Sequence, residues 1–323
     1  MVSVAAKPIN DILKDIEDLV NKYIQCCEKR KPLAIEPDDK EYIFIREGLT
    51  PCDEKFLIHR HYNFHELPLE VLRKLAILLI KTHVVQNVNY DHIFFWAWTA
   101  QLVVEFEKDI ILFSDPEIRD EILLLFRLNL LPTRLVSYFP ELYIIVSRHF
   151  ILSAHIAFSL LERILKLKCS NHVKLDGIVT RLFTVPISRH LKSYKPGNRV
   201  NRVGHLLYLF ENNYASSQLK QDLRDYRDTC IQVYSCKGGG YGYYFIDDWR
   251  NRLLHGEKFW SSMSAAIVNL ISLLLLHEIP LSLYNKRKSE LVVRFKTPSE
   301  IESNPFIFYP PKNSISNCFT THK

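Results

Sequence analysis

Apolar residues recur at the three-to-four residue spacing of an α-helix along most of this chain, and glycine is scarce. In residues 9–29 the apolar side chains, among them Ile12, Ile16 and Val20, form one helical stripe. Only 9 of the 323 residues are glycine, whereas leucine and isoleucine are abundant. Because sandwiches and barrels depend on many tight turns, this balance predicts a mainly α-helical fold with a few short peripheral strands.

The same spacing, together with start and stop signals, predicts where the helices lie. Pro68 and residues 114–117 have the residue types of a first helical turn. Pro132 is expected to end a helix, and the chain after Pro280 is expected to be irregular. The predicted helices cover residues 9–29, 69–85, 92–106, 116–131, 141–168, 203–211, 217–234, 248–255 and 259–278. The predicted strands cover residues 41–45, 291–295 and 306–309.

Composition and cysteine usage favour a folded cytoplasmic protein. Hydrophobic residues make up 47% and charged residues 24% of the chain, and the formal net charge is +6. The seven cysteines include no CxxC pair, which is typical of free thiols in a reducing compartment. The longest apolar run, residues 265–276, is interrupted by Asn269 and Ser272 and is too short for a membrane span. We therefore expect a buried core helix there and no membrane partner.

No internal repeat or low-complexity linker divides the chain. From the helix pattern we expect a helical region of unknown role over residues 1–140, a helical bundle over residues 141–280 and an irregular tail over residues 281–323. Functional signals concentrate in the second part, where Arg250-Asn251-Arg252-Leu253-Leu254-His255-Gly256 stands out.

This segment is expected to be a short helix that begins at a capping Asp247 or Asp248 and ends at Gly256. Asn251 and His255 are four residues apart and so share one face. The long side chain of Arg250 can reach round to that face, while Leu253 and Leu254 would hold the helix against the core.

An arginine, an amide and a histidine suit the cleavage of an RNA phosphodiester. The 2′-hydroxyl must lose a proton, the leaving 5′-oxygen must gain one, and the phosphate charge must be stabilised. Histidine exchanges protons near neutral pH, and a helix C-terminus would favour its protonated form. Arginine makes permanent, bidentate contacts to phosphate oxygens. Such a scheme requires no metal and no cofactor.

The segment Arg-Asn-x-x-x-His-Gly resembles the R-x4–6-H signature of the HEPN superfamily. The order of elements over residues 141–280, with a long first helix, intermediate helices, the motif and a long closing helix, is also similar to that family. The resemblance implies a dimerising helical bundle with metal-independent endoribonuclease (RNase) activity. It makes Arg250, Asn251 and His255 the catalytic candidates, and places the protein in RNA processing, antiviral defence or a toxin–antitoxin system.

The resemblance also implies a homodimer, because one motif supplies one histidine while cleavage needs both an acid and a base. An antitoxin or a sensor partner is a further family-level expectation. Two alternatives stay open. The motif can be a solvated helix end in which Arg250 pairs with Asp247 and His255 only caps, and the domain can be a non-catalytic dimerisation or binding module.

Other segments carry weaker signals. The basic stretch over residues 189–202 is either an RNA-binding surface or an ordinary exposed loop. The glycine-rich segment 237–242 lacks the ending of a phosphate loop, and it is expected to be a connector beside the cleft. Three histidines at positions 59, 61 and 65 do not fit a single metal-binding face, so surface or capping roles are favoured. The candidate RNA-binding residues are Arg189, Lys192, Lys195, Arg199, Arg202, Arg252 and Tyr241. Tyr243 and Tyr244 could likewise stack on bases, although packing is the favoured role for at least two of these three tyrosines.

Overall fold

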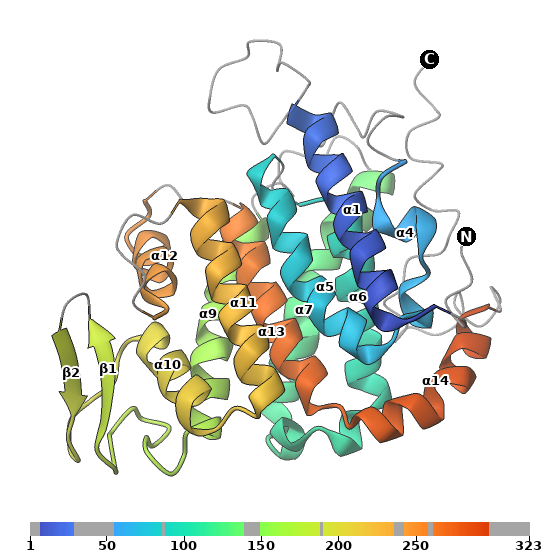
Figure 1. The fold of residues 1–323 in the computed structure, drawn as a ribbon. Coiled ribbons are helices and arrows are strands. Elements are labelled where there is room, and N and C mark those ends of the chain that lie inside the picture. The colour runs from blue at the N-terminus through green and yellow to red at the C-terminus, as the bar shows by residue number, and fades with distance from the viewer. Residues whose placement is uncertain are drawn as a thin grey trace.

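The computed structural model describes residues 7–28, 55–85, 88–138, 149–187, 190–235, 242–257 and 261–296. Within these ranges the chain is a bundle of α-helices with one β-hairpin, which confirms the mainly α-helical prediction (Figure 1). The helices are α1 (Ile9–Glu28), α4 (Ile58–His61), α5 (Leu69–Lys81), α6 (Tyr90–Glu105), α7 (Pro116–Tyr138), α9 (His149–Lys168), α10 (Val203–Asn213), α11 (Ser217–Tyr234), α12 (Tyr244–Leu254), α13 (Ser261–Glu278) and α14 (Leu281–Lys296). Short 3-10 turns cover Phe64–Glu66, Thr82–Val84, Glu107–Asp109 and Ile111–Ser114.

Helix α13 forms the centre of the bundle. It packs against α5, α9, α6 and α11, and every residue from Ser261 to Leu276 is buried (Figure 1). Two of its polar side chains form hydrogen bonds inside the core: the indole of Trp96 donates a 2.7 Å hydrogen bond to Asn269, and the Ser272 hydroxyl donates to the carbonyl of Val268. The prediction of a buried core helix is confirmed. Of the helices described, α13 alone has the length and mean hydropathy of a membrane span, and 89% of that stretch is buried.

The N-terminal helices belong to the same hydrophobic core. Helix α5 packs against both α13 and α11, and Arg73 donates to the backbone carbonyls of Leu276 and Ile279. One continuous cluster of buried side chains runs from α1 to α14. The regions on the two sides of residue 140 thus share one hydrophobic core. The domain boundary expected there stays a prediction.

Two expectations about prolines were wrong. Helix α7 continues through Pro132 to Tyr138, so the cost of one proline in a helix, about 3 kcal/mol, is offset by packing between α7 and α9. After Pro280 the chain forms α14 rather than an irregular tail or a strand. The carbonyl of Pro280 accepts the first helical bond, from Tyr284, because a proline is tolerated in a first turn. The Tyr284 hydroxyl then binds the carbonyl of Leu67 at 2.7 Å.

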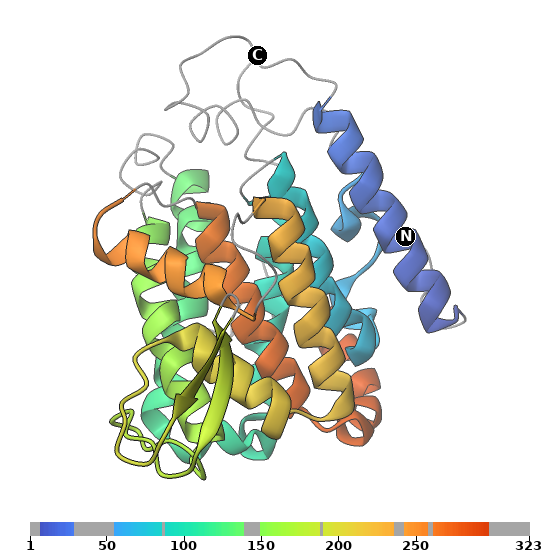
Figure 2. The ribbon, with the colours of Figure 1, turned by 60° about the vertical axis from the view of Figure 1, so that its left-hand side comes forward.

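Part of the basic stretch over residues 189–202 forms one strand of a β-hairpin, and the rest, from residue 195 on, is irregular. Strands β1 (Phe183–Ile187) and β2 (His190–Tyr194) pair antiparallel, with Phe183 opposite Tyr194 and Val185 opposite Lys192. Phe183, Val185 and Tyr194 are buried, and β1 packs against α10. Figures 1 and 2 both place the hairpin beside α10, at the α12 end of the bundle and away from α1. The expected strands at residues 41–45 and 306–309 lie outside the described residues.

Candidate functional site

Helix α12 carries the motif and is anchored by its aromatic face. Trp249 is buried and meets the ring of Tyr234 edge-on at 4.7 Å between centroids, and the ring of Phe245 at 4.9 Å. Leu253 is buried as expected, whereas Leu254 is 56% exposed. One position along a helix turns the side chain by about 100°, so only the first of the two leucines faces the core.

The start of α12 differs from the prediction. The helix begins at Tyr244, a turn earlier than expected, and Asp247 and Asp248 lie inside it. The buried Asp247 instead accepts a 3.0 Å hydrogen bond from the backbone N–H of Gly204, in the first turn of α10. Arg202 is the N-cap residue of α10, and its own side chain makes no capping hydrogen bond. Asp247 therefore caps α10 and fixes the motif helix to it.

The end of α12 was predicted correctly. His255 is the C-cap residue and Gly256 has φ +66°, a conformation that glycine adopts without steric cost. The N–H of Glu257 donates to the carbonyl of Arg252 at 2.9 Å, and that of Gly256 donates to Leu253 at 3.3 Å. These two bonds are a Schellman motif, which places His255 at the negative end of the helix dipole.

Asn251 and His255 are both exposed, so the face they share is open to solvent. Arg250, in contrast, is held from two sides. Its Nη2 lies 3.1 Å from Oε2 of Glu162 on α9, and its Nη1 donates to the carbonyl of Asn201 at 3.1 Å. The suggested pair between Arg250 and Asp247 is therefore replaced by a pair with Glu162. The guanidinium keeps further N–H groups beyond these two bonds.

Glu162 is shared between two cations of the site. Its Oε1 lies 2.8 Å from Nζ of Lys166, one turn along α9, while its Oε2 binds Arg250. The Glu162 side chain is only 18% exposed, so this carboxylate is shielded from bulk water. The pairing orients the guanidinium relative to α9 and keeps it close to the loop before α10.

Close packing between α10 and α12 raises the pKa of Asp247. A Cβ atom at Gly204 would lie 2.5 Å from the carbonyl oxygen of Tyr243 and 2.9 Å from Oδ2 of Asp247, so only glycine fits. Burial raises the pKa of Asp247 to about 6, although the bond from Gly204 and the charges of Arg202 and Arg250 oppose the shift. Among the described residues, Oδ2 of Asp247 has no hydrogen-bond partner.

The basic residues lie in and around the hairpin. Lys192, Lys195, Arg199 and Arg202 are exposed as expected, and the structure adds two exposed cations that the sequence reasoning missed. These are Lys174 and Arg181. Short bridges between Val173 and Val179, and between residues 178 and 199, bring their segment against the basic stretch. No local charge run marks them, so only the fold reveals them.

The remaining sequence candidates have mixed outcomes. Arg252 forms an ion pair with Asp248 at 2.9 Å on the same helix, as residues four apart do. Tyr243 is buried and donates to Glu211, whereas Tyr244 is 54% exposed. Arg189 and Tyr241, and most of the glycine-rich segment, lie outside the described residues.

The three neighbouring histidines take separate structural roles. His59 lies 2.8 Å from the carboxylate of Asp91, and the ring of His61 bonds the carbonyl of Lys55. His65 is buried against Trp98 rather than on the surface, so the expected surface role is wrong for this residue. His65 lies within the 3-10 turn Phe64–Glu66, where both it and Phe64 are buried.

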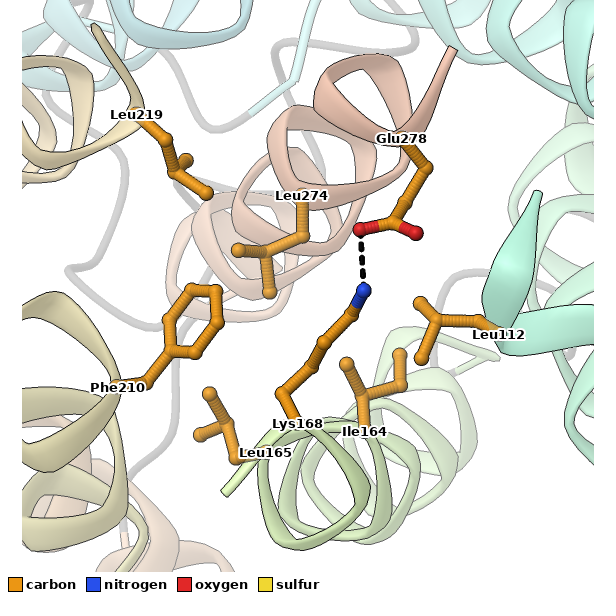
Figure 3. A pocket seen from close by; sticks show the side chains of 8 residues that line it. All are labelled: Leu112, Ile164, Leu165, Lys168, Phe210, Leu219, Leu274 and Glu278. Atoms are coloured by element: carbon orange, nitrogen blue, oxygen red, sulfur yellow. Dashed lines mark hydrogen bonds and ion pairs between the residues drawn. The ribbon is translucent and has the colours of Figure 1, made fainter. Parts of the chain in front are cut away.

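A small hollow in the bundle is too small for a substrate. It holds about 10 Å³, close to the minimum for one water molecule. Figure 3 shows an ion pair between Lys168 and Glu278 at its edge and apolar side chains around it. No residue of α12 lines this hollow.

No family model, no curated protein and no solved structure matches this chain. The resemblance to HEPN proteins depends on the motif and on the order of the helices.

Proposed function

We propose that the protein is a metal-independent endoribonuclease of the HEPN type, which cleaves RNA by attack of the 2′-hydroxyl. The observation that carries the proposal is the arrangement on α12. Asn251 and His255 are solvent-exposed, and Arg250 is oriented by Glu162 and Asn201. Arg250 is turned toward Glu162 and Asn201 but is still 30% exposed, so all three side chains are at least partly open to solvent.

Each residue has a distinct role in this scheme. His255, the C-cap residue of α12, transfers a proton. Arg250 stabilises the charge that develops on the phosphate oxygens, with N–H groups that Glu162 and Asn201 leave available. Asn251 orients the substrate or the imidazole.

A second copy of the chain would complete the site in this proposal. One motif supplies a single histidine, so the general acid and the general base come from two subunits. The large hydrophobic side chains of Tyr244 and Leu254 are exposed on the same short helix, and a dimer that pairs two motif helices would cover them. By family resemblance, we place the enzyme in the cytoplasm, in antiviral defence or a toxin–antitoxin system with an antitoxin or sensor partner.

The test is cleavage of a mixed RNA pool by the purified protein in EDTA, beside His255→Ala, Arg250→Ala and the control Glu257→Ala. Glu257 is exposed and follows the motif, so its loss should leave cleavage unchanged. We expect cleavage by the wild type and the control, and its loss in both motif variants. Equal cleavage by all four proteins would exclude this site.

One observation favours a second function, that of a non-catalytic interaction module. The ion pair between Arg250 and Glu162 is also what a purely structural arginine would form. Under this alternative no RNA is cut in any condition, and Arg250→Ala lowers stability without an effect on RNA.

A further inference from the structure

The segment that covers residues 171–187 and 190–202, here called the basic lobe, carries a dense and one-sided charge. Asp176 is its sole acidic residue among those described. Against it stand six exposed cations: Lys174, Arg181, Lys192, Lys195, Arg199 and Arg202. Charge of one sign over such a small surface attracts a polyanion and releases its counterions on binding.

The cations of the basic lobe are not neutralised within the described part of the chain. None of them forms an ion pair with a described carboxylate, and Lys192 instead lies over the ring of Tyr194, 4.7 Å from its centroid. Elsewhere arginines do find acids: Arg163 binds Asp115 at 2.7 Å. The lobe therefore keeps its charge available for an outside partner.

The aromatic rings of the lobe face inward. Phe183 and Tyr194 stack on each other, with centroids 4.9 Å apart, and both are buried. His172 bonds the hydroxyl of Tyr214. No phenylalanine, tyrosine or tryptophan of the described lobe is exposed. Proteins that hold single strands stack the bases on exposed aromatic rings, whereas a double-helical RNA keeps its bases stacked and is contacted mainly through its phosphates and 2′-hydroxyls.

The lobe is tied directly to the motif. The carbonyl of Asn201, next to Arg202, accepts a hydrogen bond from Arg250. Strand β1 packs on α10 and α10 packs on α12, so the hairpin and the motif helix occupy the same end of the bundle (Figure 2). An RNA bound along the lobe passes close to Arg250.

We propose that the basic lobe binds the phosphate backbone of double-helical RNA, and that the substrate is RNA with a stem, cut at an unpaired nucleotide beside it. An unpaired nucleotide can rotate out of its stack, which attack by its own 2′-hydroxyl requires. The location of the cut rests on the proposed nuclease function, whereas the binding of the stem does not.

The test measures binding by full-length His255→Ala protein, so that cleavage does not interfere. Two labelled RNAs of equal length are compared by fluorescence anisotropy over a range of salt concentrations: a stem–loop and an unstructured single strand. We expect the stem–loop to bind at least tenfold more tightly. Equal or tighter binding of the single strand would overturn the proposal.

The lobe itself is tested by the combined variant Lys174→Ala, Arg181→Ala, Lys192→Ala and Lys195→Ala in the same protein. Its matched control removes the same charge from α1, the turn after α6 and α14, at the exposed residues Lys14, Lys22, Lys108 and Lys286. For duplex DNA, each phosphate contact adds about 0.9 to the slope of log binding constant against log salt concentration. Loss of four such contacts should therefore make this slope shallower by about 3 to 4 in the lobe variant.

In the control variant, the slope of log binding constant against log salt concentration should become shallower by less than 1. Unchanged stem binding by the lobe variant, with circular dichroism showing an intact fold, would refute the assignment. Failure of the nuclease proposal gives a different result. If the wild-type protein binds the stem through the lobe but cuts no RNA, the nuclease proposal fails and the assignment of the binding surface stands.

Discussion

Nη2 of Arg250 lies 3.1 Å from Oε2 of Glu162, so an ion pair joins the motif helix to the long helix α9. The two residues are 88 positions apart in sequence. Both side chains are partly shielded from solvent, and the same carboxylate also holds Lys166. The arginine that we assign to phosphate binding is therefore positioned before any substrate arrives.

This pair predicts energetic coupling between the two residues. Glu162→Ala should lower the free energy of unfolding by about 1–2 kcal/mol, as expected for a partly buried, charge-assisted hydrogen bond. In a double-mutant cycle with Arg250→Ala, urea unfolding should give a coupling energy of about 1 kcal/mol. Additive effects of the two changes would show that the pair contributes nothing in solution.

Glu162 also makes a prediction about activity. Glu162→Gln keeps the shape of the side chain but removes its charge, so Arg250 is held less firmly. We expect kcat/KM for RNA cleavage to fall about tenfold, the equivalent of 1.4 kcal/mol, while the fold stays intact. Lys166→Gln, which removes the other cation from the same carboxylate, is the matched control and should have a smaller effect. A larger loss in Lys166→Gln than in Glu162→Gln would contradict this role.

Asp247 predicts a specific dependence of stability on pH. Burial raises its folded pKa from 3.8 to about 6, above its unfolded value. Folding therefore favours the protonated carboxyl of Asp247. The resulting contribution to the free energy of unfolding is complete below pH 4 and is lost as the pH rises through about 6. A shift of this size corresponds to roughly 3 kcal/mol.

The comparison that isolates this effect is wild type against Asp247→Asn, whose amide stays neutral and can still accept from Gly204. Between pH 4 and pH 7, the wild type should lose up to about 3 kcal/mol of stability relative to the variant. Asp248→Asn, which changes the half-exposed neighbour, should follow the wild-type curve. Parallel curves for Asp247→Asn and wild type would show that Asp247 has an ordinary pKa.

Gly204 tests how tightly α10 and α12 pack. In Gly204→Ala the new methyl group would collide with the backbone carbonyl of Tyr243, which cannot move without shifting α12. We expect a loss of about 1–3 kcal/mol in the free energy of unfolding. Asn213→Ala, at the exposed end of the same helix, should change stability by no more than about 0.5 kcal/mol. A stable Gly204→Ala protein would mean that the two helices are further apart than described.

The turn at Gly256 provides a test of the C-cap. Its φ of +66° disfavours a side chain, so Gly256→Ala should cost about 1–2 kcal/mol in a thermal unfolding measurement. Gly256→Asn should cost less, because asparagine adopts this conformation more readily. The same cost for both substitutions would show that the conformation at this position does not matter.

Much of the fold could be predicted from local sequence patterns. The helical spacing located α1, α5, α6, α11 and α13 because each helix buries one face, or all of its surface, in the core. The predictions failed where one local sequence signal is compatible with two different structures. Pro280 follows the end of one helix and also precedes the start of α14. The polar residues of β2 do not indicate a strand by themselves, because the inward face of the hairpin is completed by β1 and α10.

The candidate site was only partly accessible to sequence reasoning. The exposed pair of Asn251 and His255 and the turn at Gly256 follow from spacing and residue type within a single helix. The partners of Arg250 and of Asp247 come from α9 and α10 and depend on tertiary packing. No local pattern distinguishes Asp247 as the cap of another helix from Asp247 as the cap of its own.

The chemical ends of the cleavage products test the central claim most directly. Stem–loop RNA is incubated with wild-type protein in EDTA, and the products are analysed by mass spectrometry, with His255→Ala as the control. Attack by the 2′-hydroxyl predicts fragments that end in a 2′,3′-cyclic phosphate and begin with a 5′-hydroxyl, and no fragments from the variant. Products with 3′-hydroxyl and 5′-phosphate ends, or no products at all, would contradict the account.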